Sequence, residues 1–280
     1  MDENLKNKIV QEVMNQLAAY SDNDETEPIE LESKEMIGIE NPHNIEALKV
    51  MRSSTPARIL IGRAGTRQKT GSLLNFLADH AAAVDAVFTE VSEELLKKHD
   101  LFSVQTVVVD KNMYLMKPES GKKLTEESRN IILEKCPKKK KVQLIIVDGL
   151  SSTAIENNLD DILPAFTQGL KTEGIEMGVP FFVKYGRVGV EDEIGKMLDC
   201  DVVVQLIGER PGLTTAESLS AYIIYRPNDN TVEADRTVIS NIHKGGTPPA
   251  EAGAHLATVV KTILNHKASG VKLSEMLKNQ

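Results

Sequence analysis

The sequence has 280 residues, of which 41% are hydrophobic and 26% charged, the ordinary range of a globular protein with one or two domains. Thirty-three basic against 41 acidic side chains give a net charge of −8, which disfavours binding to nucleic acid or to a membrane surface. Two cysteines without a CxxC pair exclude a disulfide framework and indicate no zinc site. No membrane-spanning apolar run or secretory signal is recognisable, so we expect a soluble cytoplasmic protein.

The chain begins with a predicted amphipathic helix over residues 1–20. Leu5, Ile9, Val13 and Leu17 recur at four-residue spacing, which places them on one face of a helix. Residues 21–36 are acidic with few apolar side chains, a composition typical of a flexible linker. Because a helix of about 18 residues is marginal alone in water, we expect its apolar face to dock on another surface. Packing on its own domain, or fraying, is the alternative.

Residues 37–280 read as an α/β domain. Apolar segments predict strands at 57–62, 104–112, 141–152, 180–188 and 201–212. Helical patterns alternate with them at 68–91, 122–136 and 154–174, the second with Thr125 as N-cap and the third interrupted by Pro164. A long C-terminal helix is expected to start at Pro248–Pro249 and to end at Gly270. Unbroken apolar strands between helices imply a doubly wound, mostly parallel sheet covered on both faces.

Polar residues follow several of these strands, where doubly wound sheets bind their ligands. Gly62-x-x-Gly65 with Arg63 and Arg67 suits an anion site, but it is neither a GxGxxG motif nor a P-loop. We favour a tight turn whose arginines pair with acids of a partner chain. Asp148–Gly149 suits a metal or catalytic carboxylate, but we favour a turn in which Asp148 accepts backbone hydrogen bonds.

Glu209 ends an apolar strand and is followed by Arg210-Pro211-Gly212, a stiff corner of the chain. A carboxylate held there suits an amide-bearing ligand, and an internal Glu–Arg pair is equally consistent. His243 lies in a segment that differs from the Asp-x-His-x-x-Gly pattern of cobalt-binding histidines, because Asn241 replaces the aspartate. We therefore expect a turn there. Spacing indicates neither a catalytic residue set nor a metal site anywhere in the chain.

Five segments in order, RILIGRAGTR, PFFVKYGRVG, GERPGL, EADRT and SNIHKGGTPP, resemble the small (light) subunit of ethanolamine ammonia-lyase. The resemblance covers about residues 37–273. It implies an adenosylcobalamin-dependent enzyme that converts ethanolamine to acetaldehyde and ammonia by radical chemistry. It also implies that the large subunit, a TIM barrel, carries most of that chemistry. The small subunit, a Rossmann-like α/β domain, then closes the cobalamin site at the interface between the two.

The resemblance also implies which residues contact the cofactor. Carried over motif by motif, they are Val188 in YGRV, Glu209 in GERPG and Val238 after EADRT. The two valines would act through backbone groups, and Glu209 would accept hydrogen bonds from the amides of the corrin ring. Val238 stands where a member of the family has cysteine, a change that a backbone contact survives.

The family is associated with bacterial microcompartments, which implies that residues 2–20 address the chain to shell proteins. Two other functions stay open. One is a stand-alone phosphate- or nucleotide-binding enzyme that uses the loop of Arg63 and Arg67, and the missing P-loop weighs against it. The other is a non-catalytic scaffold for the large subunit, which differs only in whether Glu209 touches cobalamin.

Overall fold

The computed structural model describes residues 37–279. Contacts divide the chain into two compact units, Met1–Leu77 and Ala78–Gln280. The helix predicted for residues 1–20 and the linker predicted for residues 21–36 lie outside the described residues. Helix α3 (Thr70–Phe88) includes the boundary between the units and agrees with the helix predicted at 68–91.

The first unit contains helix α2 (Ile45–Ser53) and a small hairpin of β1 (Arg63–Ala64) and β2 (Arg67–Gln68). The side chain of Asn44 caps α2 by accepting a hydrogen bond from the Ala47 N–H at 3.0 Å.

The strand predicted at residues 57–62 is wrong. Leu60 has φ 61° and Gly62 has φ 73°, both in the left-handed region that a strand does not use. The segment instead bends beside Gly38, whose N–H donates to the Leu60 carbonyl at 2.8 Å. Three consecutive apolar residues therefore form a loop, because no strand among residues 37–279 offers them a hydrogen-bonding partner.

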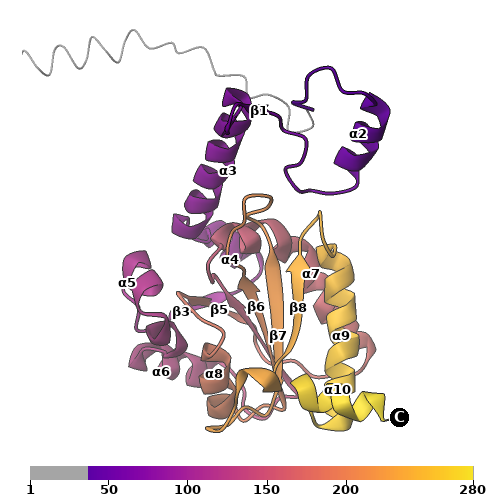
Figure 1. Ribbon diagram of the computed structural model, residues 1–280. Coiled ribbons are helices and arrows are strands. Elements are labelled where there is room, and N and C mark those ends of the chain that lie inside the picture. The colour runs from indigo at the N-terminus through magenta and orange to yellow at the C-terminus, as the bar shows by residue number, and fades with distance from the viewer. Residues whose placement is uncertain (1–36, 280) are drawn as a thin grey trace, which may run out of the picture. The chain divides into compact units, whose positions relative to one another are not determined.

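The second unit is a mixed α/β layer (Figure 1). Its elements in chain order are α4 (Glu93–Lys98), β3 (Phe102–Gln105), α5 (Lys111–Met116), η1 (Pro118–Lys122), α6 (Glu126–Lys135), β4 (Val142–Val147), α7 (Ser152–Thr172), β5 (Phe181–Lys184), α8 (Val190–Leu198), β6 (Val202–Gly208), β7 (Leu219–Tyr225), η2 (Glu233–Asp235), β8 (Thr237–Ile242), α9 (Pro249–His266) and α10 (Gly270–Lys278).

Six strands form one sheet in the order β3-β5-β4-β6-β7-β8. The first four are parallel, and β7 and β8 continue the sheet as antiparallel strands. The sheet is therefore mixed, with its parallel part built from the strands that alternate with helices. The order differs from the 3-2-1-4-5-6 of the classical dinucleotide-binding sheet, because β3 lies at the edge.

Both faces of the sheet are covered by helices, as predicted. All six residues of β4 are buried, and alternate residues point to opposite faces. Leu144 and Ile146 pack in a core with α7 and α9, while Ile145 and Val147 pack with α6 and α8. The two cores explain why this strand is unbroken in apolar character.

Several predicted boundaries differ from the structure. The strands predicted at 141–152, 180–188 and 201–212 end earlier, at Val147, Lys184 and Gly208. The strand predicted at 104–112 ends at Gln105, because Asp110 caps α5 by accepting from the Met113 N–H at 2.7 Å. Helix α7 continues through Pro164, because buried side chains on both sides of the proline fix it in the core. The C-terminal helix ends at His266, and Gly270, with φ 61°, opens a further helix. The helix predicted from Thr125 is confirmed.

Candidate functional site

The carboxyl ends of β4, β5 and β6 meet at one edge of the sheet and surround a pocket of about 480 Å³. That volume lies within the usual range of small-molecule sites, about 300–1,000 Å³. Its lining includes Tyr114, Leu150, Val188, Glu209, Tyr222 and Ser240. The pocket therefore lies where ligands bind in open α/β sheets.

Close packing of backbone shapes the centre of this pocket. Gly149 follows β4 with φ 60°, and a Cβ there would lie 2.3 Å from the Gly208 carbonyl oxygen at the end of β6. A side chain would push the two strand ends apart, so only glycine fits. Leu150 follows and donates its N–H to the same Gly208 carbonyl at 3.1 Å.

Glu209 is held by the strands beside it. Its Oε2 accepts from the Ser218 hydroxyl at 2.7 Å, and its Oε1 accepts from the Ser220 hydroxyl and from the Asn241 N–H, the latter at 3.2 Å. Ser218 and Ser220 flank or lie in β7, and Asn241 lies in β8. The carboxylate thus ties β6, β7 and β8 together beside the pocket. In the described part of the chain no ion pair includes Glu209, so the Glu–Arg pair kept open above does not form.

These contacts keep Glu209 charged. Partial burial raises the pKa of the carboxyl, but hydrogen bonds from Ser220, Ser218 and Asn241 outweigh it and hold the pKa below its ordinary value of 4.5. Oε2 accepts one of these bonds, and a carboxylate oxygen has two lone pairs, so Glu209 keeps the capacity to accept from a ligand.

Val188 and Val238 approach the pocket from different elements. Val188 precedes α8, lines the pocket and is half-buried, and its carbonyl accepts from the Glu191 N–H at 3.2 Å. Val238 lies in β8 opposite Tyr222, a pocket residue, and is 43% exposed. It shares its face of β8 with Ser240, which also lines the pocket. Of the three predicted contact residues, the structure thus brings two into the pocket wall and the third next to it.

Asp148 lies behind the pocket and is almost fully buried. Its carboxylate accepts from the N–H groups of Gly149, Tyr185 and Gly186 at 2.9–3.2 Å. Burial raises its pKa to about 6, although Lys111 and these donors oppose the rise. The predicted turn is therefore confirmed: Asp148 holds the backbone after β5 in place.

Lys111 at the start of α5 is the cation nearest to Asp148, with its Nζ 3.9 Å from Oδ2. The ammonium group is buried between the rings of Tyr114 and Tyr185, and burial lowers its pKa. Arg187, which also lines the pocket, places its guanidinium carbon 4.0 Å from the Tyr114 ring centroid. It also donates a hydrogen bond to the Tyr114 carbonyl at 2.8 Å. These contacts tie α5 to the segment that carries Val188.

The other predicted motifs are turns. Arg63 donates to the Thr66 carbonyl at 3.2 Å within the hairpin turn. The Nδ1 of His243 accepts from the Gly245 N–H at 3.1 Å, so its Nε2 carries the proton and donates to Asn241 at 2.8 Å. Both ring nitrogens are therefore used within the loop. Among residues 37–279 no cluster of three or more His, Cys, Asp or Glu side chains could hold a metal ion, and Cys136 and Cys200 are buried free thiols.

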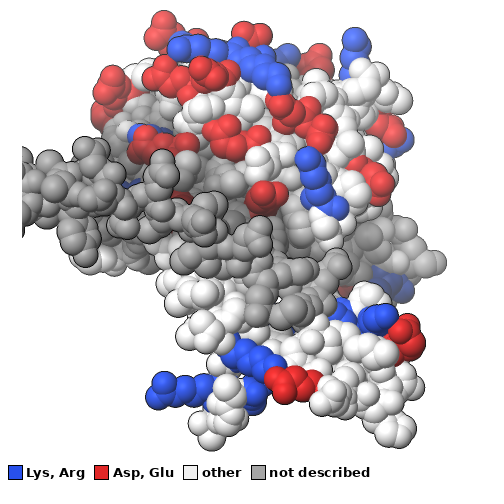
Figure 2. All heavy atoms as spheres, turned by 90° about the horizontal axis from the view of Figure 1, so that it is seen from above, with Lys and Arg blue, Asp and Glu red and all other residues white. Residues whose placement is uncertain are grey.

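Acidic and basic side chains are interspersed on the face of the molecule shown in Figure 2. The described residues visible there form no continuous basic surface of the kind that tracks a nucleic-acid backbone. None of the described helices combines the length and the apolar character that a membrane crossing requires.

Sequence reasoning missed the residues that hold Glu209. Ser218 and Ser220 are two positions apart in an apolar stretch that forms a strand, a spacing that places both hydroxyls on one face. This two-residue spacing is the feature of the sequence from which the pair of hydroxyls could have been predicted. No local pattern indicates the roles of Tyr114 and Arg236, because these roles depend on contacts across more than 40 residues.

Fold and pocket together define a class: a mixed α/β domain with a polar, ligand-sized pocket at its strand ends. The model of the family "Ethanolamine ammonia-lyase light chain (EutC)" matches residues 45–274. An ethanolamine ammonia-lyase small subunit of Clostridium perfringens is 50% identical over 267 residues, which cover 95% of this chain and 90% of that protein. One of Clostridioides difficile (strain 630) is 52% identical, covering 87% and 83%. The chain belongs to the ethanolamine ammonia-lyase light chain family.

Proposed function

We propose that this chain is the small subunit of an adenosylcobalamin-dependent ethanolamine ammonia-lyase. In this proposal it completes the cobalamin site at the interface with a catalytic large subunit, and the enzyme converts ethanolamine to acetaldehyde and ammonia. The observation that carries the proposal is that Val188 and Glu209 line one pocket and that Val238 lies on the strand beside it. Relatives over nearly the whole chain are named small subunits of that enzyme.

The chemistry of the pocket fits part of a cobalamin molecule. The corrin ring carries many amide groups, and Glu209 is a charged acceptor with unused capacity beside the hydroxyl groups of Tyr222 and Ser240. The valines add apolar surface and backbone groups. The radical chemistry would be supplied by the bound cofactor, and the residues of this chain would orient the corrin ring and exclude water.

Two further parts of the proposal concern fold and location. Four parallel strands with helices on both faces support a Rossmann-like description of the layer. Residues 2–20 would address the complex to the shell of a microcompartment in the cytoplasm, and the acidic residues 21–36 would serve as the tether. Removing residues 1–36 should abolish co-sedimentation with intact shells and leave turnover with the large subunit unchanged. Full-level co-sedimentation of the shortened chain would contradict the targeting role.

Glu209→Gln tests the cofactor site. The substitution keeps the size of the side chain but replaces one acceptor oxygen by a donor and removes the charge. A hydrogen bond to a charged group contributes about 1.5–3 kcal/mol, so we expect roughly ten- to hundredfold weaker adenosylcobalamin binding by the complex of both subunits. The control is Glu217→Gln, in the loop before β7. Unchanged cofactor affinity together with a dissociated complex would favour the scaffold function.

A further inference from the structure

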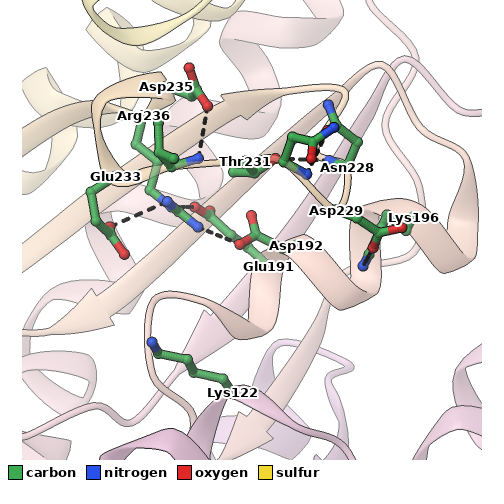
Figure 3. A network of polar contacts seen from close by, with 12 residues as sticks. Lys122, Glu191, Asp192, Lys196, Asn228, Asp229, Thr231, Glu233, Asp235 and Arg236 are labelled. Atoms are coloured by element: carbon green, nitrogen blue, oxygen red, sulfur yellow. Dashed lines mark hydrogen bonds and ion pairs between the residues drawn. The ribbon is translucent and has the colours of Figure 1, made fainter.

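A buried guanidinium connects the two segments that carry Val188 and Val238 (Figure 3). The Arg236 side chain is 2% exposed and lies between η2 and β8. Its Nε donates to Glu191 at 2.6 Å, its Nη2 to Asp192 at 2.5 Å and its Nη1 to Glu233 at 3.2 Å. Glu191 is fully buried and Asp192 partly, both in the first turn of α8, whereas Glu233 is 76% exposed.

On the α8 side, Arg236 acts close to Val188. The N–H of Glu191 donates to the Val188 carbonyl at 3.2 Å, so the position of Glu191 sets that of the valine backbone. Gly189, the N-cap of α8, has no side chain to cap the helix. The start of α8 therefore depends on its acidic residues: the Arg236 guanidinium holds Glu191 and Asp192, and Arg129 holds Glu193.

On the other side, Val238 is two residues after Arg236, at the start of β8. Among the described residues this strand is an edge of the sheet. It pairs with β7 through Thr237–Ile223, Val238–Tyr222 and Ile239–Ala221 before the register becomes irregular. Its far end is fixed by the Asn241–Glu209 hydrogen bond. Arg236 fixes its near end, so the two contacts clamp the strand along the side of the pocket.

Stability alone does not account for this network. Glu191 Oε2 and Asp192 Oδ1 are buried and make no hydrogen bond, so no hydrogen bond offsets the cost of removing these two oxygens from water. Buried ion pairs can be replaced by apolar residues of similar volume without loss of stability. An apolar replacement would not fix the orientation of the two segments. The planar guanidinium of an arginine does, because it holds two carboxylates at set angles.

We propose that Arg236 is a positioning residue of the cofactor pocket, which sets the separation of Val188 and Val238 through Glu191 and Asp192. This inference rests on the proposed function. Arg236 lines no part of the pocket itself and acts through the backbone of the two segments it joins. An arginine at this place thus adds a third anchor to the pocket, beside Glu209 and the Asp148 turn.

The test compares variants in the complex with the large subunit, with adenosylcobalamin as the titrated ligand. Arg236→Lys keeps the charge but loses the fork, and the double variant Arg236→Met with Glu191→Met replaces the pair by apolar side chains of similar volume. Because small displacements at a site can cost up to about a hundredfold, we expect both to bind cobalamin about ten- to hundredfold more weakly. The double variant should stay folded and melt above Arg236→Met alone, because it leaves only the partly exposed Asp192 and the exposed Glu233 without their counter-charge.

Asp229→Asn is the matched control. Asp229 is 90% exposed and pairs with Lys196, so it also joins α8 to the segment before β8, but at the surface (Figure 3). Its removal should change cofactor affinity less than twofold. The inference is overturned if the folded double variant binds cobalamin as the unchanged chain does. If Glu209→Gln weakens binding and the Arg236 variants do not, only this inference fails. If neither Glu209→Gln nor the Arg236 variants weaken binding, the proposed function fails with it.

Discussion

Glu209 links the pocket to the stability of the sheet, because the donors that hold it charged come from β7 and β8. Its pKa is lower in the folded chain than the ordinary 4.5, so its contribution to the free energy of unfolding is present above about pH 4.5 and is lost as the pH falls. The stability gap between the unchanged chain and Glu209→Gln should therefore shrink between pH 6 and pH 3 in urea unfolding. A gap that stays constant or widens would contradict this assignment.

The buried pair of Asp148 and Lys111 also stabilises the fold. Asp148→Ala removes the acceptor for three backbone N–H groups and leaves the Lys111 ammonium buried without its counter-charge. Removing one partner of a buried pair costs about 3–5 kcal/mol, and we expect a loss of that size in the free energy of unfolding.

Adding Lys111→Met should recover part of this loss, because the remaining charge then disappears. Lys98→Met is the surface comparison: its pair with Asp160 is exposed, so the expected change is below about 1 kcal/mol. Urea unfolding of the unchanged chain and of these three variants gives the differences. If the double variant is less stable than Asp148→Ala, Lys111 stabilises the fold independently of Asp148.

The sequence predicted single site residues better than their surroundings. Glu209 and Asp148 are recognisable because each follows an unbroken apolar strand, and strand ends gather at one edge of a parallel sheet. Their partners are not recognisable in the same way. Ser220 and Arg236 reach their carboxylates only after distant strands pair, and no local pattern encodes that pairing.

At the scale of elements, Pro164 in α7 offers a direct test of tertiary packing against helix propensity. The proline lies in the exposed face of a 21-residue helix that does not break, since Ile162, Leu163 and Phe166 are buried in the core. Pro164→Ala restores a backbone N–H and should raise the free energy of unfolding by about 1–3 kcal/mol. Thermal unfolding beside Lys171→Ala, an exposed site in the same helix, measures it. A lower melting temperature of Pro164→Ala would contradict this and show that the proline stabilises the fold.

Element type was predictable where apolar periodicity is long, and element boundaries were not. β4, α6 and β6 lie where their patterns place them. The strand at 57–62 and the end of the strand at 104–112 were wrongly predicted, because a short apolar run looks the same in a strand and in a loop. Lys267 in the left-handed conformation ends α9 three residues before the glycine that the sequence suggested.

For the whole molecule, the described chain offers a pocket with positioning groups but no metal cluster among residues 37–279. In the proposed function, this chain completes a cofactor site and the large subunit binds the substrate. A pocket that closes only between two chains should bind its ligand only when both are present.

Titration of adenosylcobalamin, followed by its absorbance, tests this claim most directly. The samples are the large subunit alone, this chain alone and an equimolar mixture of both. We predict saturable binding with turnover of ethanolamine in the mixture, and binding weaker by at least about tenfold, without turnover, in either single sample. Equal affinity of the large subunit alone and of the mixture would contradict the account.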